Sequence, residues 1–203
     1  MKFFTDAITF ILIGVSVLMM LYVFGGEDII FFRKKKQQYD PKSAEKLTAV
    51  LTKFARLRGY EVLGRKTLEY QGVQYTFDNI IIGFYGTVAF NVASHSGEIY
   101  GDTTSNKWVQ IYDGKRYEFD SPTKALNGSV KMFKDIYRSE GVKSGLVDTM
   151  TIFTDKNANI AAARSLPICH VQDLAKKLDS SKYLADNGAD LEAMKAALAK
   201  YTK

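Results

Sequence analysis

An uninterrupted run of 18 residues without a formal charge, Ala7–Phe24 (AITFILIGVSVLMMLYVF), constrains this chain more than any other feature. At about 1.5 Å per residue, a helix of this length extends roughly 27 Å, close to the hydrocarbon thickness of a bilayer. The run exceeds the apolar region of a signal peptide, about 7–15 residues, and Tyr22–Asp28 offers no Ala-x-Ala-like cleavage site. We therefore expect an uncleaved transmembrane helix over residues 7–24, behind a short tail of residues 1–6.

Charges on either side of this segment predict its orientation. One cation, Lys2, precedes the run, whereas four consecutive cations lie shortly after it. The positive-inside rule then places the N-terminus outside and the rest of the chain in the cytoplasm. Residues 25–40 become a basic juxtamembrane linker, and membrane lipid becomes an expected partner, at about 1 kcal/mol per cation near an anionic surface.

The remaining composition is that of an ordinary globular protein. The 203 residues include 28 Lys and Arg against 22 Asp and Glu, 46% apolar residues, three Pro and one Cys. These values exclude collagen-like, intrinsically disordered and disulfide-framework classes. The lone Cys169 cannot form an internal disulfide, in agreement with a reducing compartment. Residues 33–203 carry a net charge of +8 and are numerous enough to bury one core.

Basic side chains continue from the linker into the start of the domain. Such cations can bind a phosphate backbone or an anionic lipid surface, and a solvated helix face explains them as well. The candidate nucleic-acid- or lipid-binding residues are Arg33, Lys34, Lys35, Lys36, Lys42, Lys46 and Lys53. A second basic stripe, Lys131, Lys134 and Arg138, follows one side of a later predicted helix.

The first half of the domain predicts one helix followed by strands. Asp40 can cap and Pro41 can begin a helix, whose apolar residues recur at helical spacing until Gly59 ends it. From residue 60 onward, apolar residues instead recur at every second position, which is typical of strands. Strands are expected over residues 60–62, 73–77, 80–82 and 87–93, with a tight turn at 83–86. The strand pattern places Asn91 on a face that it shares with Ala89 and Ala93.

The second half adds a hairpin, a helix and further strands. Asp113-Gly114 joins two strands in the two-residue pattern of a type I′ turn. Pro122 is expected to open a helix that Gly141 closes. Later strands are predicted at 147–153 and 168–171, and two helices finish the chain. The sequence thus predicts a mixed α/β domain over residues 41–180, followed by a C-terminal helix within 181–203.

Several fragments, in this order, resemble the NERD (nuclease-related domain) family. They are Thr76–Gly86 (TFDNIIIGFYG), Thr87–Ser94 (TVAFNVAS), Ser96–Gly101 (SGEIYG), Trp108, Ser121-Pro122 and Thr151–Asp155 (TIFTD), with Ala158, Leu174 and Leu178 beyond them. The resemblance covers about residues 41–178. It implies a restriction-endonuclease-like mixed β-sheet flanked by helices, of the PD-(D/E)XK type, whose active members cut nucleic acid with a divalent metal.

The resemblance also implies which positions would form the nuclease centre. Asp78 matches the first acidic ligand, Asn91 stands where the family has an acidic residue, and Ala93 stands where it has a lysine. The helix before the sheet usually contributes a glutamate, for which Glu45 is the nearest candidate. An expected asparagine and glutamine fall on Ser121 and Ala125. Mg²⁺ or Mn²⁺ needs converging carboxylates, and an amide at position 91 supplies no charge to hold such an ion.

These departures favour an inactive binding or scaffold module at the membrane, which needs no cofactor. One alternative is a metal-dependent DNA nuclease with Asp78 and Glu45 as ligands and with carboxylates recruited from Glu69, Glu98 or Asp102. The other is a membrane-surface adaptor for another membrane-associated protein. DNA and such a protein are thus the alternative partners beside lipid. A Cys169–His170 nucleophilic pair is not expected, because adjacent strand residues point to opposite faces.

Overall fold

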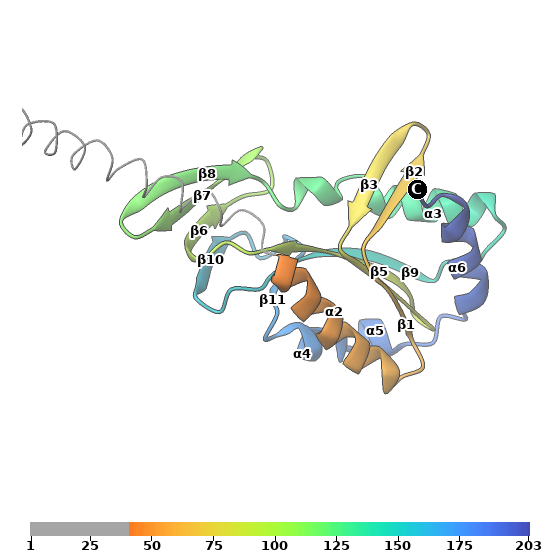
Figure 1. Ribbon diagram of the computed structural model, residues 1–203. Helices are drawn as coiled ribbons and strands as arrows, with labels where there is room; N and C mark the ends of the chain where they lie inside the picture. The colour runs from red at the N-terminus through yellow and green to blue at the C-terminus, as the bar shows by residue number, and fades with distance from the viewer. Residues whose placement is uncertain (1–40) are drawn as a thin grey trace, which may run out of the picture. The chain divides into compact units, whose positions relative to one another are not determined.

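The computed structural model describes residues 41–203, which belong to one compact unit (Figure 1). The predicted tail, membrane span and basic linker, residues 1–40, lie outside the described residues. Within residues 41–203, no helix is both long enough and apolar enough to cross a membrane.

A five-stranded mixed sheet forms the centre of this unit. Its order is β1-β4-β5-β9-β11, with antiparallel pairs from β1 to β5 and parallel pairs from β5 to β11. The strands are β1 (Glu61–Leu63), β4 (Asn79–Gly83), β5 (Gly86–Ala93), β9 (Leu146–Phe153) and β11 (Ile168–His170). Every residue of β4 is buried, because helices cover the sheet on both faces, as its apolar run Ile80–Ile82 predicts.

The helices form two layers on opposite faces of this sheet (Figure 1). The first layer packs Leu47, Leu51, Leu174 and Tyr183 on the sheet, and the second packs Phe133, Tyr137, Met194 and Leu198. The first consists of α2 (Pro41–Arg56), α4 (Leu174–Leu178) and α5 (Ser181–Leu184). The second consists of α3 (Ser129–Ser139) and α6 (Leu191–Lys200). The C-terminal helix is therefore part of the core.

A second, four-stranded sheet has the order β10-β6-β7-β8. Its strands are β6 (Gly97–Gly101), β7 (Lys107–Tyr112), β8 (Lys115–Asp120) and β10 (Ala158–Ala162). Asp113 and Gly114 both have positive φ, 52° and 67°, which confirms the predicted two-residue hairpin turn. The β7 residue Trp108 is fully buried, and its ring packs against those of Phe119 on β8 and Phe153 on β9.

Most predicted elements are confirmed, with several differences. Where two helices were predicted to finish the chain, three follow β11, namely α4, α5 and α6. The prediction that Pro122 opens a helix is wrong: the chain forms a turn and a short 3₁₀ helix, η2 (Lys124–Leu126), and α3 begins only at Ser129. Gly128, at φ 77°, breaks the helical path between them. The sequence pattern also missed β6 and β10, which pair with each other in parallel. It predicted β3 (Val73–Phe77) correctly but missed β2 (Lys66–Tyr70), with which β3 forms a separate hairpin.

Candidate nuclease-related site

Asp78 lies at the junction of β3 and β4, directly beside the next strand of the sheet. Its backbone N–H donates to Phe90 O at 3.0 Å. Its carboxylate Oδ2 accepts the backbone N–H of Val92 at 2.8 Å. The fold therefore brings Asp78 to the segment that contains Asn91 and Ala93, and its carboxylate serves as a backbone acceptor there.

Neither Asn91 nor Ala93 presents an acidic or basic group at this position. In the orientation that satisfies its hydrogen bonds, the Asn91 amide donates from Nδ2 to Thr76 O at 3.2 Å and to Phe90 O at 2.9 Å. Ala93 is 4% exposed and packs into the apolar cluster that also holds Trp108. Both side chains therefore support the local strand structure.

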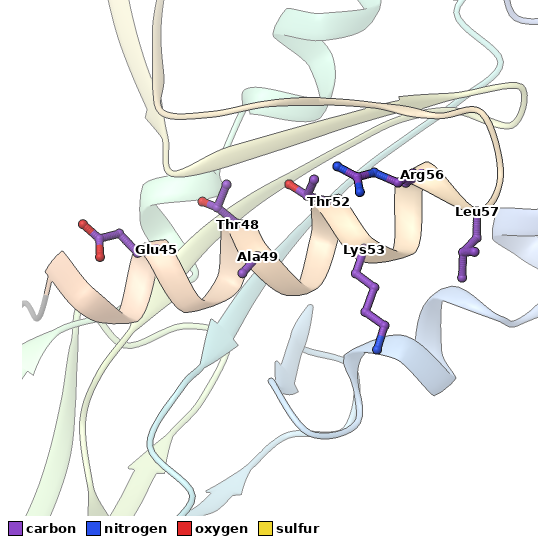
Figure 2. Close-up of a pocket in the computed structure, with 7 residues that line it drawn as sticks. All are labelled: Glu45, Thr48, Ala49, Thr52, Lys53, Arg56 and Leu57. Carbon is purple, nitrogen blue, oxygen red and sulfur yellow. The ribbon is translucent and has the colours of Figure 1, made fainter.

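Glu45 lies on the exposed side of α2, where seven residues of this helix and its C-terminal end line a groove of about 590 Å³ (Figure 2). One turn further along, Thr48 Oγ1 shares its hydrogen between Asn79 Oδ1 at 3.0 Å and the backbone oxygen of Ala44 at 2.9 Å. This bond joins α2 to Asn79, the neighbour of Asp78 in the chain. The Asn79 side chain is completely buried, and its Nδ2 has no hydrogen-bond partner.

Sequence reasoning overlooked Asn79, although the pattern contained a signal. Asn79 and Ile81 share one face of a strand whose apolar residues predict complete burial. A polar side chain at a buried position needs a specific partner, because an unsatisfied polar group is costly in an apolar environment. Here the partner is the hydroxyl of Thr48.

The donor atoms at the nuclease-related positions do not fit a magnesium site. Of positions 78, 91 and 93, only Asp78 has a carboxylate, and its Oδ2 already accepts the Val92 N–H, whereas a nuclease centre needs converging carboxylates around the ion. The Glu45 carboxylate lies on the exposed side of α2. The Asn91 amide directs its nitrogen to backbone carbonyls, and Ala93 has no donor. Across residues 41–203, no three His, Cys, Asp or Glu side chains gather in a metal-binding group.

The carboxylates considered as replacements have other partners. Glu69 is paired with Lys203 and accepts a hydrogen bond from Gln74, and both interactions hold its pKa below the ordinary value. Glu98 accepts the hydroxyl of Tyr100 at 2.7 Å. Asp102 accepts bonds from Ser105 and Thr104, which lower its pKa to about 2.

The histidines and the cysteine are likewise held by local contacts. The His95 ring stacks on Phe119, with centroids 3.7 Å apart, and burial lowers its pKa. Burial raises the pKa of the Cys169 thiol, which donates to the backbone oxygen of His170 at 3.2 Å. A nucleophilic cysteine instead requires a lowered pKa.

A basic groove of about 680 Å³ lies on the α3 side of the sheet. The cations of the predicted stripe on α3 line it, together with Asn127 and the β9 residue Thr149. Thr149 shares a strand face with Thr151, whose register partner on β5 is Asn91. The groove and Asn91 therefore occupy the same face of the central sheet. The lining cations are Lys131, Lys134 and Arg138.

The positions of the expected asparagine and glutamine border the same region. Ser121 is buried, with its hydroxyl 3.2 Å from that of Thr123, whereas Ala125 is exposed. Between them, Pro122 O accepts the Thr151 hydroxyl at 3.2 Å, which ties this segment to β9.

These features define a mixed α/β domain in which Asp78 is the one carboxylate among positions 78, 91 and 93, with a basic groove on one side of the central sheet. Residues 41–154 match the nuclease-related domain (NERD) family, and the chain belongs to this family. No match was found among curated proteins or among solved structures.

Proposed function

We propose that this chain is a single-pass membrane protein whose cytoplasmic nuclease-related domain binds nucleic acid without cutting it. The observation that carries the proposal is the use of the nuclease-related positions for structure. Asp78 accepts a backbone hydrogen bond, Asn91 donates to backbone carbonyls, and Ala93 is packed in a core. A restriction-endonuclease-like core that has lost its metal centre accounts for all three.

Nucleic acid is the ligand that the groove on α3 favours. Lys131 and Arg138 each lie 78% exposed beside the groove, and Lys134 is exposed between them. Asp135 is paired with both Lys131 and Arg138, which preorganises the two cations at the cost of part of their charge. A row of cations at helical spacing suits contacts with successive phosphates of a nucleic-acid backbone.

The membrane component of the proposal rests on the sequence of residues 1–40. The uncharged run at 7–24 and the cations Arg33–Lys36 support a cytoplasmic domain held at the inner membrane surface. Such an anchor raises the local concentration of the domain near a membrane-bound partner or near DNA that approaches the membrane.

A metal-dependent nuclease is the second candidate, favoured by membership of the family and by the retained Asp78. It would require Asp78 and Glu45 to share an ion with carboxylates from elsewhere, and the donor atoms at the family positions do not suit this. The remaining alternative, an adaptor for another membrane-associated protein, predicts no affinity for nucleic acid.

A combined cleavage and binding assay tests these functions. The full chain in detergent is offered plasmid and single-stranded DNA with Mg²⁺ or Mn²⁺, beside Asp78→Ala. We expect DNA binding, and no cleavage by either protein. Cleavage that Asp78→Ala abolishes would overturn the proposal in favour of the nuclease. Absence of both cleavage and binding would leave the adaptor.

A further inference from the structure

Three large apolar side chains are exposed around one end of the α2 layer. Leu57, directly after α2, is 76% exposed; Phe84, in the β4–β5 turn, is 47% exposed; and Leu184, at the end of α5, is 47% exposed. We call these residues the apolar trio. A single exposed apolar side chain is ordinary, so the question is whether the three belong to one surface.

Contacts between their neighbours place the three segments together. Arg58 forms an ion pair with Asp179, which joins the end of α2 to the connection between α4 and α5. The rings of Tyr60 and Phe84 are 6.1 Å apart, which joins the segment after α2 to the β4–β5 turn. The three segments that carry the trio are thus linked at this end of the domain.

Further contacts join the β4–β5 turn to α5. The rings of Tyr85 and Tyr183 are 5.9 Å apart and meet edge to face. In addition, the backbone N–H of Asn187 donates to Phe84 O at 3.0 Å. Since Tyr85 follows Phe84 and Tyr183 precedes Leu184, the apolar trio surrounds one aromatic cluster.

The helices beside the trio are strongly basic. Together α2, α4 and α5 hold seven Lys and Arg residues and one acidic residue, Glu45; Asp173 and Asp179 flank α4, and Asp179 is paired with Arg58. Lys53 and Leu57 project to the same side of α2 (Figure 2). Lys182, next to the buried Tyr183, is 53% exposed and pairs with Asp148 at 2.6 Å. Apolar side chains next to cations are the combination that binds an anionic membrane surface.

From these observations we infer that the domain docks on the anionic membrane surface through the apolar trio, with Lys53 and Lys182 against lipid phosphates. Nucleic acid suits this surface less well, because two of its three apolar side chains, Leu57 and Leu184, neither stack on bases nor pair with phosphates. The inference rests on the membrane anchoring in the proposed function, and it does not depend on the nucleic-acid groove.

The length of chain before α2 makes such docking possible. Only residues 37–40 separate the cations Arg33–Lys36 from the first residue of α2. Five Cα–Cα steps, from Lys36 to Pro41, extend at most about 18 Å. If the cations lie at the headgroups, α2 begins within this distance of the membrane. The trio lies at the other end of this 16-residue helix, about 24 Å from Pro41, so docking through the trio requires α2 to lie inclined to the membrane plane.

Environment-sensitive labels on the full chain test this inference. Single cysteines replace the trio in a Cys169→Ala background (Leu57→Cys, Phe84→Cys and Leu184→Cys), and each carries an NBD fluorophore. The matched controls are Val73→Cys on the β2–β3 hairpin and Ile111→Cys on β7, whose side chains are 50% and 37% exposed. The chain is reconstituted in nanodiscs of phosphatidylcholine, with or without phosphatidylglycerol.

We expect blue-shifted, brighter emission at the three trio positions and not at Val73 or Ile111. The shift should be larger with phosphatidylglycerol and should diminish in high salt. Lys53→Gln should weaken docking about fivefold, the equivalent of one cation near an anionic surface.

Three outcomes would contradict the inference, and they separate it from its premise. If the chain enters nanodiscs but the trio labels behave like the controls, docking is wrong and the anchor stands. If all five labels shift equally, lipid contact is not confined to this surface and the inference is also wrong. If the chain enters no nanodisc and does not float with phosphatidylglycerol vesicles, both the anchor and the docking are wrong.

Discussion

The carboxylate of Asp78 accepts the backbone N–H of Val92 at 2.8 Å and so fastens the beginning of β4 to β5. The next residue in the chain, Asn79, accepts a hydrogen bond from the hydroxyl of Thr48 on α2. Two adjacent residues at the beginning of β4 thus connect this strand to a second strand and to a helix. This arrangement gives Asp78 a structural role that does not require a metal.

Asp78→Ala should lower the free energy of unfolding by about 1–3 kcal/mol, because the partly buried Val92 N–H loses a charged acceptor. Asp78→Asn, which retains a carbonyl oxygen, should cost less. Unfolding can be followed by the fluorescence of the buried Trp108. The control is Asp120→Ala: this carboxylate is 82% exposed and pairs with Lys107, so we expect a change within about 0.5 kcal/mol. Equal effects of Asp78→Ala and the control would refute the structural role.

Ala93→Lys, which restores the family residue, should destabilise the domain by more than about 3 kcal/mol. The methyl group is 4% exposed among Ile99, Trp108 and Phe153, so an ammonium group there would lose its hydration without a partner. Thermal unfolding of the variant is compared with that of Ala161→Lys, at an exposed position on β10. A mild effect at both positions would show that the site can still accommodate a catalytic lysine.

The central part of the fold was predictable because its signals are local. Ile80–Ile82 and the returning strand with Asn91 gave the correct central strands, and Asp113-Gly114 gave the correct hairpin. The parallel pairing of β6 with β10 was not predictable in this way, since it joins residues about 60 positions apart. In addition, apolar and polar residues alternate only weakly along each of the two strands. The interruption at Gly128 was missed because the apolar stripe of α3 extends back to Leu126, which is buried in η2 instead.

The candidate site was predicted only as a set of positions. Family resemblance placed Asp78, Asn91 and Ala93 together, and the structure brings them to neighbouring strands. The hydrogen bonds of Asn91 and the packing of Ala93 depend on segments distant in sequence, Thr76 and Trp108, so no local pattern reports them. The role of Glu45 stays a prediction, as do those of Lys42, Lys46 and Lys53.

Gly101→Ala should destabilise the domain by about 1–3 kcal/mol through overpacking. A Cβ atom at this residue would lie 2.1 Å from Cδ2 of the Trp108 indole, which is itself fully buried and cannot easily move. Gly64→Ala is the matched control, because a Cβ there meets no atom within 4 Å. We expect the Gly101 variant to lose stability in chemical denaturation and to change the Trp108 emission, with neither effect at Gly64. Similar stability of the two variants would mean that the second sheet adjusts freely around the indole.

Acid should weaken the attachment of α5 through Asp148. Burial acts to raise the pKa of this carboxyl, but hydrogen bonds from Lys182 and Tyr183, each 2.6 Å long, outweigh it and lower the pKa. A lowered native pKa contributes stability above the unfolded value, near 4, which is lost as the pH falls through the native value. Asp148→Asn should therefore be less stable than the native chain at pH 7, with the difference narrowing below about pH 4. A difference independent of pH, in unfolding measured from pH 7 to 2, would contradict this assignment.

Nucleic-acid affinity should respond in opposite directions to two changes in the groove on α3. Lys134→Gln removes one cation, so binding should weaken and the slope of log K against log salt should fall by about 0.7–0.9, as for one lost phosphate contact. Asp135→Asn releases Lys131 and Arg138 from their shared carboxylate and should tighten binding.

Fluorescence anisotropy of labelled DNA at several salt concentrations measures both effects. Lys115→Gln, on the exposed edge strand β8, has the same charge change away from the groove and should leave the slope almost unaltered. If the affinity of all three variants depends on net charge alone, and the two lysine variants lose equal affinity, binding is a property of the whole basic domain and not of this groove. Opposite effects of Lys134→Gln and Asp135→Asn, with Lys115→Gln unchanged, would instead locate the phosphate backbone on the same sheet face as Asn91.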